Sequence, residues 1–202
     1  MRQYEQTKIA LILLAAGYSR RFGQNKLLYP VNGQPMYKYG LDTLREAAQL
    51  LEVNCQVQVV TQYQQIREAC SSQGIPVYIN PDPDLGIASS MQIGLEHNLQ
   101  MDACLFMVAD QPRLTAESVK ELVEGFLISE KGMGVACFQE KMGNPCIFGA
   151  KYFQQLLEIS GDRGGKVLIR KYPEDVFYYQ IKDPGELLDI DYSAEFKRSY
   201  PE

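Results

Sequence analysis

Short apolar runs alternate along the chain with longer segments whose apolar residues recur every three or four positions. The short runs are typical of β-strands and cover residues 9–13, 56–61, 75–80, 103–109, 134–138, 146–148 and 176–181. The longer segments predict helices over residues 36–49, 63–72, 116–129, 150–159 and 166–171, and Met91, Leu95 and Leu99 mark one more helical stripe.

This alternation starts at the N-terminus, so we expect right-handed βαβ crossovers and a mostly parallel sheet covered by helices on both faces. A chain of 202 residues is long enough for one sizeable core, and no repeat or long linker divides it. The pattern therefore predicts an α/β fold, a single three-layer αβα domain over residues 1–202.

The loop after the first apolar run, residues 14–26, reads LAAGYSRRFGQNK. Glycines let a backbone approach a ligand closely, and the N–H groups of such a loop can point at phosphate oxygens. Arginine and lysine side chains add charge-assisted hydrogen bonds. A strand, a basic glycine-rich loop and a helix are typical of a phosphate site, although neither the P-loop nor the G-x-G-x-x-G spacing is present.

The distribution of charge points to the same segment. The net charge is −5, yet residues 6–41 contain five cations and no aspartate or glutamate. An acidic chain that keeps carboxylates out of one segment is expected to bind an anion there. The overall acidity argues against a general nucleic-acid or anionic-membrane surface.

Two later segments also follow strands. Residues 81–90 form a proline-rich turn before a helix of small residues, where Ser89 and Ser90 can cap the helix or bind a ligand. Asp110 ends a continuous apolar run, and in a parallel sheet the carboxyl ends of the strands form the ligand edge. Because Thr115 already supplies a cap for the next helix, we favour Mg²⁺ binding over capping for Asp110.

The remaining reactive residue types indicate no further chemistry. The five cysteines include no C-x-x-C pair, and three lie in apolar strand runs, so we expect reduced core thiols rather than disulfides or a zinc site. His97, the one histidine, lies near a helix end and is given no role. No signal peptide and no apolar run of about 20 residues is seen, which predicts a cytoplasmic protein with no membrane partner.

The loop at residues 14–26 resembles the signature of nucleotidyltransferases built on a nucleotide-diphospho-sugar-transferase-like (Rossmann-like) fold. Members of that family move a nucleoside monophosphate from an NTP to a phosphate and release pyrophosphate. The resemblance implies catalytic roles for Arg21, Lys26 and Asp110. It also implies a nucleotide site that contains Leu14, Ala15, Ala16, Gly17, Ser19, Arg20, Arg21, Gly23, Lys26, Gly86, Ser89 and Ser90.

Later motifs narrow the resemblance to the molybdenum cofactor nucleotidylyltransferases of the MobA/MocA type. They are G-N-P at 143–145, S-G-D-R-G at 160–164 and D-I-D at 189–191. The resemblance implies acceptor-binding residues Gly143, Asn144, Pro145, Asp162 and Arg163, although Asp162 and Arg163 also suit a simple polar turn. Asp191 would be a second Mg²⁺ ligand beside Asp110. Two positions depart from the family pattern, since Asn144 replaces a histidine and Tyr192 a threonine.

The alanine pair Ala15-Ala16 before Gly17 is similar to the cytidylyl branch, which implies Mg²⁺-dependent transfer of CMP from CTP to molybdopterin. The product would serve a molybdenum hydroxylase apoenzyme. The attacking phosphate monoester is already ionised near pH 7, so no general base is required. Three alternatives stay open: use of GTP, use of a sugar phosphate as acceptor, or a non-catalytic accessory protein that binds the molybdenum cofactor.

Overall fold

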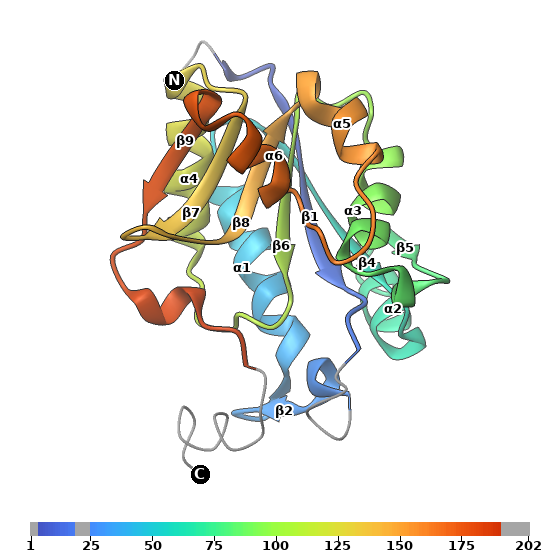
Figure 1. Cartoon of the computed structure of the whole chain (residues 1–202). Coiled ribbons are helices and arrows are strands. Elements are labelled where there is room, and N and C mark those ends of the chain that lie inside the picture. Colours follow the sequence, from blue (N-terminus) through green and yellow to red (C-terminus); the bar gives the residue numbers. More distant parts are fainter. Residues whose placement is uncertain (1–3, 19–24, 191–202) are drawn as a thin grey trace.

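The computed structural model describes residues 4–18 and 25–190, and its centre is one twisted sheet (Figure 1). The strands pair in the order β5-β4-β1-β6-β8-β7-β9. Their bounds are β1 Lys8–Ala15, β4 Asn54–Thr61, β5 Val77–Ile79, β6 Ala103–Val108, β7 Met133–Phe138, β8 Lys141–Gly149 and β9 Val176–Gln180. Only β8 among these strands runs opposite to the others, which confirms the predicted mostly parallel sheet.

Helices cover both faces of the sheet because the residues of β1 alternate between two cores. Ile9, Leu11 and Leu13 belong to the core under α1 (Met36–Leu50), α2 (Gln64–Ser71) and α4 (Ala116–Ser129). Ala10, Ile12 and Leu14 belong to the core under α3 (Ile87–Glu96), α5 (Phe153–Leu157) and α6 (Lys166–Lys171). A strand that is buried on both faces needs a continuous apolar run, and this run is why β1 could be predicted from the sequence.

The short ribbon of β2 (Pro30–Val31) and β3 (Gln34–Pro35) lies between the loop after β1 and α1 (Figure 1). Its Val31 packs with Met36 and with Ile190 from the far end of the chain, in a small separate cluster. The ribbon therefore links the segment between β1 and α1 with the end of the described chain, at Ile190.

Two sequence expectations about elements are wrong, and a third, the helical segment at 150–159, is confirmed over a shorter range. Residues 141–145 were expected to connect two strands, but they are the first half of β8 and pair with β7, from Phe138–Lys141 and Cys137–Met142 onward. The helix expected over 150–159 is a 3-10 turn followed by the short α5. Helix α3 stops at Glu96, so Leu99 lies beyond it with 53% of its surface exposed.

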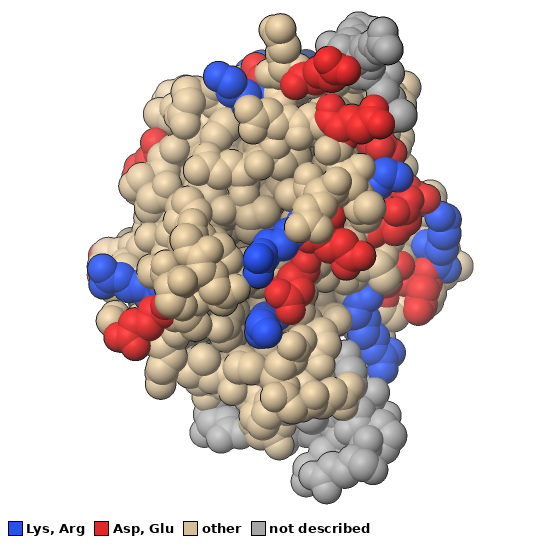
Figure 2. Space-filling model, turned by 180° about the vertical axis from the view of Figure 1, so that it is seen from behind, with Lys and Arg blue, Asp and Glu red and all other residues tan. Residues whose placement is uncertain are grey.

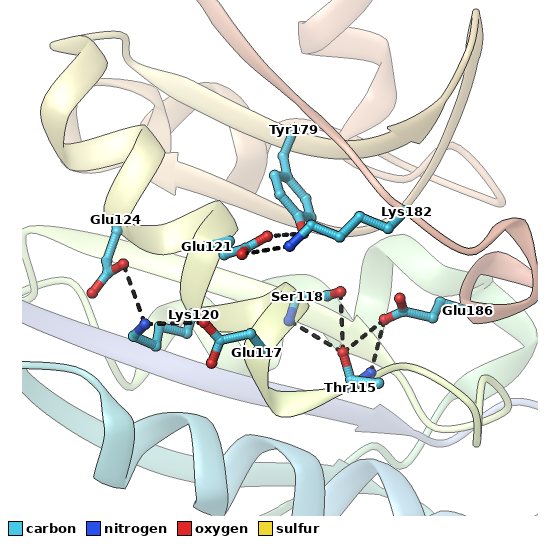
Figure 3. Close-up of polar contacts among 9 residues, drawn as sticks. All are labelled: Thr115, Glu117, Ser118, Lys120, Glu121, Glu124, Tyr179, Lys182 and Glu186. Atoms are coloured by element: carbon cyan, nitrogen blue, oxygen red, sulfur yellow. Dashed lines mark hydrogen bonds and ion pairs between the residues drawn. The ribbon is translucent and has the colours of Figure 1, made fainter.

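The C-terminal segment, residues 182–190, is fastened to α4 and to the loop after β6 (Figure 3). Glu121 accepts hydrogen bonds from Lys182, at 2.7 Å, and from the Tyr179 hydroxyl. The buried carboxylate of Glu186 accepts from the backbone N–H and the hydroxyl of Thr115, the residue that caps α4. The segment then continues to the end of β6, where the Ile190 N–H donates to the Asp110 carbonyl at 3.0 Å.

Charged side chains of both signs lie next to one another on the face seen from behind (Figure 2). On α4, for example, Lys120 lies 3.1 Å from Glu117 and 3.7 Å from Glu124. Pairs of this kind neutralise each other locally. Within residues 4–18 and 25–190, no helix has the length and apolar character needed to span a bilayer.

The cysteines and the histidine lie where the sequence predicted. All five cysteines are free thiols and four are buried, and the four that belong to strands are Cys55, Cys104, Cys137 and Cys146. Burial raises the pKa of Cys104 and of Cys146 to about 12, so both stay protonated at neutral pH. His97 is exposed at the end of α3 and stacks on Tyr78, with 3.8 Å between ring centroids.

Candidate active site

A cleft of about 420 Å³ opens at the carboxyl ends of β1 and β6. Its lining comes from the end of β1 and the loop that continues to Lys26, the turn before α3, the end of β6, and the loop that carries Asp162. The lining residues that the sequence analysis named are Leu14, Ala16, Gly17, Lys26, Gly86, Ser90, Asp110 and Asp162. Residues from four distant segments thus meet at the edge of the sheet where the fold class places ligands.

The loop after β1 is held in shape by side chains that follow the neighbouring strand β4. The carbonyls of Ala15, Ala16 and Gly17 accept hydrogen bonds from Thr61, Gln62 and Tyr63, at 2.8, 2.7 and 2.9 Å. A trans peptide points its C=O and its N–H in opposite directions, so the N–H groups of Gly17 and Tyr18 face away from β4. Both of these residues line the cleft.

The roles of Thr61, Gln62 and Tyr63 were not predicted from the sequence. Their position could have indicated these roles, because three polar residues in a row stand at the end of a predicted parallel strand and directly after it, at the same edge of the sheet as the loop. Ala15, by contrast, was assigned to the nucleotide site, but it is fully buried and is not among the lining residues. Ala15 contributes only through its carbonyl, which accepts a hydrogen bond from the Thr61 hydroxyl.

Lys26 and Asp110 form an ion pair inside the cleft, with 2.7 Å between Nζ and Oδ2. Asn25 accepts a hydrogen bond from the Leu27 N–H and thereby begins the 3-10 turn Lys26–Leu28, which fixes the backbone of Lys26. Only 9% of Lys26 is exposed. Lys26 is therefore a largely buried residue of the site and not an ordinary surface lysine.

The second carboxylate oxygen of Asp110, Oδ1, is buried and has no hydrogen-bond partner in the part of the chain that the structure describes. A buried carboxylate oxygen without a partner costs free energy unless a ligand satisfies it. Such an oxygen fits a hard divalent cation, as the sequence predicted. Since the described residues contain no group of three or more candidate metal ligands, most of the coordination shell would come from ligand and water oxygens.

A second cavity, of about 340 Å³, adjoins the cleft and shares Leu14, Ile87 and Asp162 with it. Predicted acceptor residues Asn144, Asp162 and Arg163 line this second cavity. The other two, Gly143 and Pro145, are buried in β8 and are not among its lining residues; Gly143 packs against Leu187 instead. Lys166 and Arg170 of α6 also line it and were not singled out by the sequence analysis.

The turn before α3 joins the two cavities. Gly86 has a φ of +83°, and a Cβ placed there would lie 2.5 Å from the Gly161 carbonyl carbon. The Ala88 N–H donates to the Gly161 carbonyl at 3.2 Å. Glycine is thus required at residue 86 both for its backbone conformation and for the close approach of the loop that carries Asp162.

Ser89 and Ser90 do not cap α3, because the cap position belongs to Gly86. Both hydroxyls accept hydrogen bonds from the Asn80 amide at 2.9 Å, and the Ser89 hydroxyl also donates to the Gly86 carbonyl. Ser90 lines the cleft whereas Ser89 does not. The buried amide therefore ties the start of α3 to the end of β5.

Several predicted site residues fall outside the described ranges, namely Ser19, Arg20, Arg21, Gly23 and Asp191. They remain predictions from the sequence. Tyr192, one of the two departures from the family pattern, is also outside.

A protein-family model described as "MobA-like NTP transferase domain" matches residues 11–176. The chain belongs to this family. The match begins in β1 and ends where β9 starts, so it includes the cleft and the second cavity together. The fold and the family predicted from the loop and from the later motifs are both confirmed.

Two curated relatives and one solved protein illustrate the family. The chain is 26% identical to the purine catabolism protein PucB of Bacillus subtilis, over 92% of each chain. It is 27% identical to a probable molybdenum cofactor guanylyltransferase of Pyrococcus horikoshii, over 77% of this chain and 75% of the relative. Rv0371c of Mycobacterium tuberculosis superposes with a TM-score of 0.82 at 22% identity, covering 97% of this chain and 100% of Rv0371c. A manganese complex of Rv0371c gives a TM-score of 0.77 at 21% identity, covering 96% of this chain and 98% of that one.

Proposed function

We propose that this nucleotidyltransferase moves CMP from CTP to the phosphate of molybdopterin, in a Mg²⁺-dependent reaction that releases pyrophosphate. The observation that carries the proposal is the Lys26–Asp110 pair in the cleft, where one buried carboxylate oxygen of Asp110 has no hydrogen-bond partner among the described residues. A lysine and a metal-ready carboxylate side by side are what a triphosphate needs at its α-phosphate.

The residues of the chain have separate tasks in this reaction. Lys26 stabilises the charge that develops on the α-phosphate. The N–H groups of Gly17 and Tyr18, with Ser19, Arg20 and Arg21, hold the β- and γ-phosphates and then the leaving pyrophosphate. Since the attacking phosphate monoester is already ionised, catalysis depends on position and charge neutralisation, and His97 takes no part.

Mg²⁺ bound at Asp110 supplies charge neutralisation at the phosphate oxygens. Support for a divalent cation comes from the free Asp110 oxygen and from the manganese complex of the structural relative. Asp191 is proposed as a second ligand, because Ile190, the residue before it, donates its N–H to the carbonyl of Asp110. That contact brings the C-terminal segment to the end of β6.

The nucleotide is proposed to be CTP because of the Ala15-Ala16-Gly17 sequence, which resembles the cytidylyl branch. Ala16 and Gly17 line the cleft, so these small residues face the bound nucleotide. GTP is the second candidate, and the name of the Pyrococcus relative favours it. The proposed setting is the cytoplasm, with a molybdenum hydroxylase apoenzyme as the recipient of the product.

Pyrophosphate release from CTP, GTP and ATP tests the proposal, with Mg²⁺ present and with or without molybdopterin. Release that requires both CTP and molybdopterin is the expected result. A preference for GTP would assign the chain to the guanylyl branch. Tight nucleotide binding without any release would favour a non-catalytic accessory protein for the molybdenum cofactor.

A further inference from the structure

The second cavity contains a cluster of cations that the reaction described above does not use. Arg163, Lys166 and Arg170 all line it, against a single lining carboxylate, Asp162. In the described ranges no ion pair or side-chain hydrogen bond involves these three cations. Lys166 is also half-buried, beside the buried thiol of Cys146.

Lys166 is half-buried, whereas Arg163 and Arg170 are exposed. Three cations that line one cavity without protein partners among the described residues favour an anionic ligand, because an anion bound there would accept charge-assisted hydrogen bonds from several of them at once. The ligand is not the triphosphate, for which Lys26 and the basic loop lie in the adjoining cleft. Leu14, Ile87 and Asp162 line both regions and form the boundary between them. The second cavity therefore binds an anionic group that belongs to the acceptor.

The attacking phosphate of the acceptor cannot be that group. It must reach the α-phosphate of the nucleotide, and the groups that act there, Lys26 and Asp110, line the cleft and not the second cavity. The floor of the second cavity is apolar, with Met91 and Phe106 beside Leu14, and suits a flat carbon framework. The acceptor thus has a phosphate at one place, an apolar body, and another anionic centre.

We propose that Arg163, Lys166 and Arg170 bind a second anionic centre of the acceptor, separate from the attacking phosphate, and so select the acceptor. This inference rests on the proposed function. Molybdopterin meets the requirement, because its dithiolene sulfurs form an anionic centre apart from its phosphate. A sugar 1-phosphate does not, since its remaining polar groups are neutral hydroxyls.

The test compares the wild type with the double variant Lys166→Gln/Arg170→Gln, which leaves the buried Leu168 and Ile169 of α6 unchanged. Lys171→Gln is the control: it removes one positive charge from the same helix, but Lys171 does not line the second cavity and lies over the ring of Tyr172. The measurements are the KM for molybdopterin in pyrophosphate release under anaerobic conditions, kcat, and the Kd for CTP with Mg²⁺.

We expect the double variant to raise the KM for molybdopterin by about tenfold or more, from the loss of two charge-assisted contacts. The Kd for CTP and kcat should stay within about twofold to threefold, and Lys171→Gln should match the wild type. The KM of the wild type should also rise more steeply with salt than that of the double variant, because salt screens the lost contacts.

Three results would overturn the inference. They are an unchanged KM for molybdopterin in the double variant, a Kd for CTP that rises as much as that KM, and turnover of glucose 1-phosphate by the wild type as efficient as that of molybdopterin. If the wild type releases no pyrophosphate at all, the proposed function fails first. Direct titration of molybdopterin, measured by calorimetry under anaerobic conditions, then decides the inference: equal binding by wild type and double variant contradicts it, and weaker binding by the double variant supports it.

Discussion

Lys26 and Asp110 form an ion pair in the cleft, with 2.7 Å between Nζ and Oδ2, and only 9% of Lys26 is exposed to solvent. An ion pair of this kind persists until a ligand supplies a more favourable partner for each of the two charged groups. A triphosphate with its metal does so, because the lysine can turn to phosphate oxygens while the carboxylate binds the cation. The pair therefore keeps two opposite charges in place before the substrate arrives.

Gly17 provides a test of the phosphate loop that does not disturb the fold. A Cβ at this residue would meet no atom of residues 4–18 and 25–190 within 4 Å, and its backbone is outside the left-handed region. Gly17→Ala should therefore change the free energy of unfolding by no more than about 0.5 kcal/mol. The added methyl group would occupy the cleft, so we expect the Kd for CTP to rise at least about tenfold, measured by calorimetry. Unchanged CTP affinity in the folded variant would show that the nucleotide does not pass over Gly17.

The residues that sequence could identify are those whose role follows from their place in the chain. Asp110 follows β6 and Lys26 ends the loop that follows β1, and these two strands are parallel neighbours, so both residues lie at the same edge of the sheet. Lys166 and Arg170 could not be assigned in the same way. Their roles depend on which way their side chains point once α6 is packed against the sheet, and periodicity does not give that direction.

Among the elements, the turn before α3 is the connection between the cleft and the second cavity. Gly86→Ala would place a methyl group in the space of Gly161 and force an unfavourable backbone conformation. We expect a loss of about 1–3 kcal/mol in the free energy of unfolding and a higher KM for both substrates, since the two loops must separate.

Gly74→Ala is the matched control for that substitution. Gly74 has a similar φ of +72°, but a Cβ there meets nothing within 4 Å. It should cost about 1 kcal/mol for the backbone conformation alone and leave both KM values unchanged. If Gly86→Ala behaves as Gly74→Ala does, contact between the two loops has no part in substrate binding.

The strands and most helices were predictable because each has a strong local pattern, whereas β8 was predictable only in its second half. Its first residues, Lys141 to Pro145, contain glycine, asparagine and proline, which locally favour a turn. Pairing with β7 makes them a strand instead. Register across a hairpin is a tertiary property, and residue preference is overridden there.

For the molecule as a whole, the C-terminal segment, residues 182–190, packs against α4 and reaches the end of β6 beside the active site. Glu121 receives hydrogen bonds from Lys182 and Tyr179, and these lower the pKa of its carboxyl below the ordinary value of 4.5. A carboxyl with a lowered pKa stabilises the folded state above its ordinary pKa, and that stabilisation is lost as the pH falls through the folded pKa.

Glu121→Gln should therefore lower the urea midpoint of unfolding at pH 7, and the difference from the wild type should shrink as the pH falls below about 4.5. Glu124→Gln, one helical turn away and 3.7 Å from Lys120, is the control and should have a smaller effect at every pH. A difference for Glu121→Gln that stays constant from pH 7 to pH 3 would mean that the charge of Glu121 does not fasten the segment.

The three-layer architecture and the family were within reach of the sequence because they follow from element order and from motifs beside strands. The closure by residues 182–190 was not, since it consists of contacts between residues far apart in the chain, such as Glu186 with Thr115 and Ile190 with Asp110. Such contacts leave no periodic signal. They nevertheless decide where the D-I-D motif begins relative to the end of β6.

The most direct measurement is Mg²⁺-dependent pyrophosphate release from CTP with molybdopterin, compared between the wild type and Asp110→Asn. Asp82→Asn makes the same chemical change at an exposed residue near the cleft that is not part of its lining. We predict Mg²⁺-dependent release by the wild type and by Asp82→Asn, and loss of at least about a hundredfold in Asp110→Asn, because the amide lacks the negative charge that binds the cation. Full activity of a folded Asp110→Asn variant would contradict the assignment of this cleft as the metal-dependent nucleotidyltransferase site.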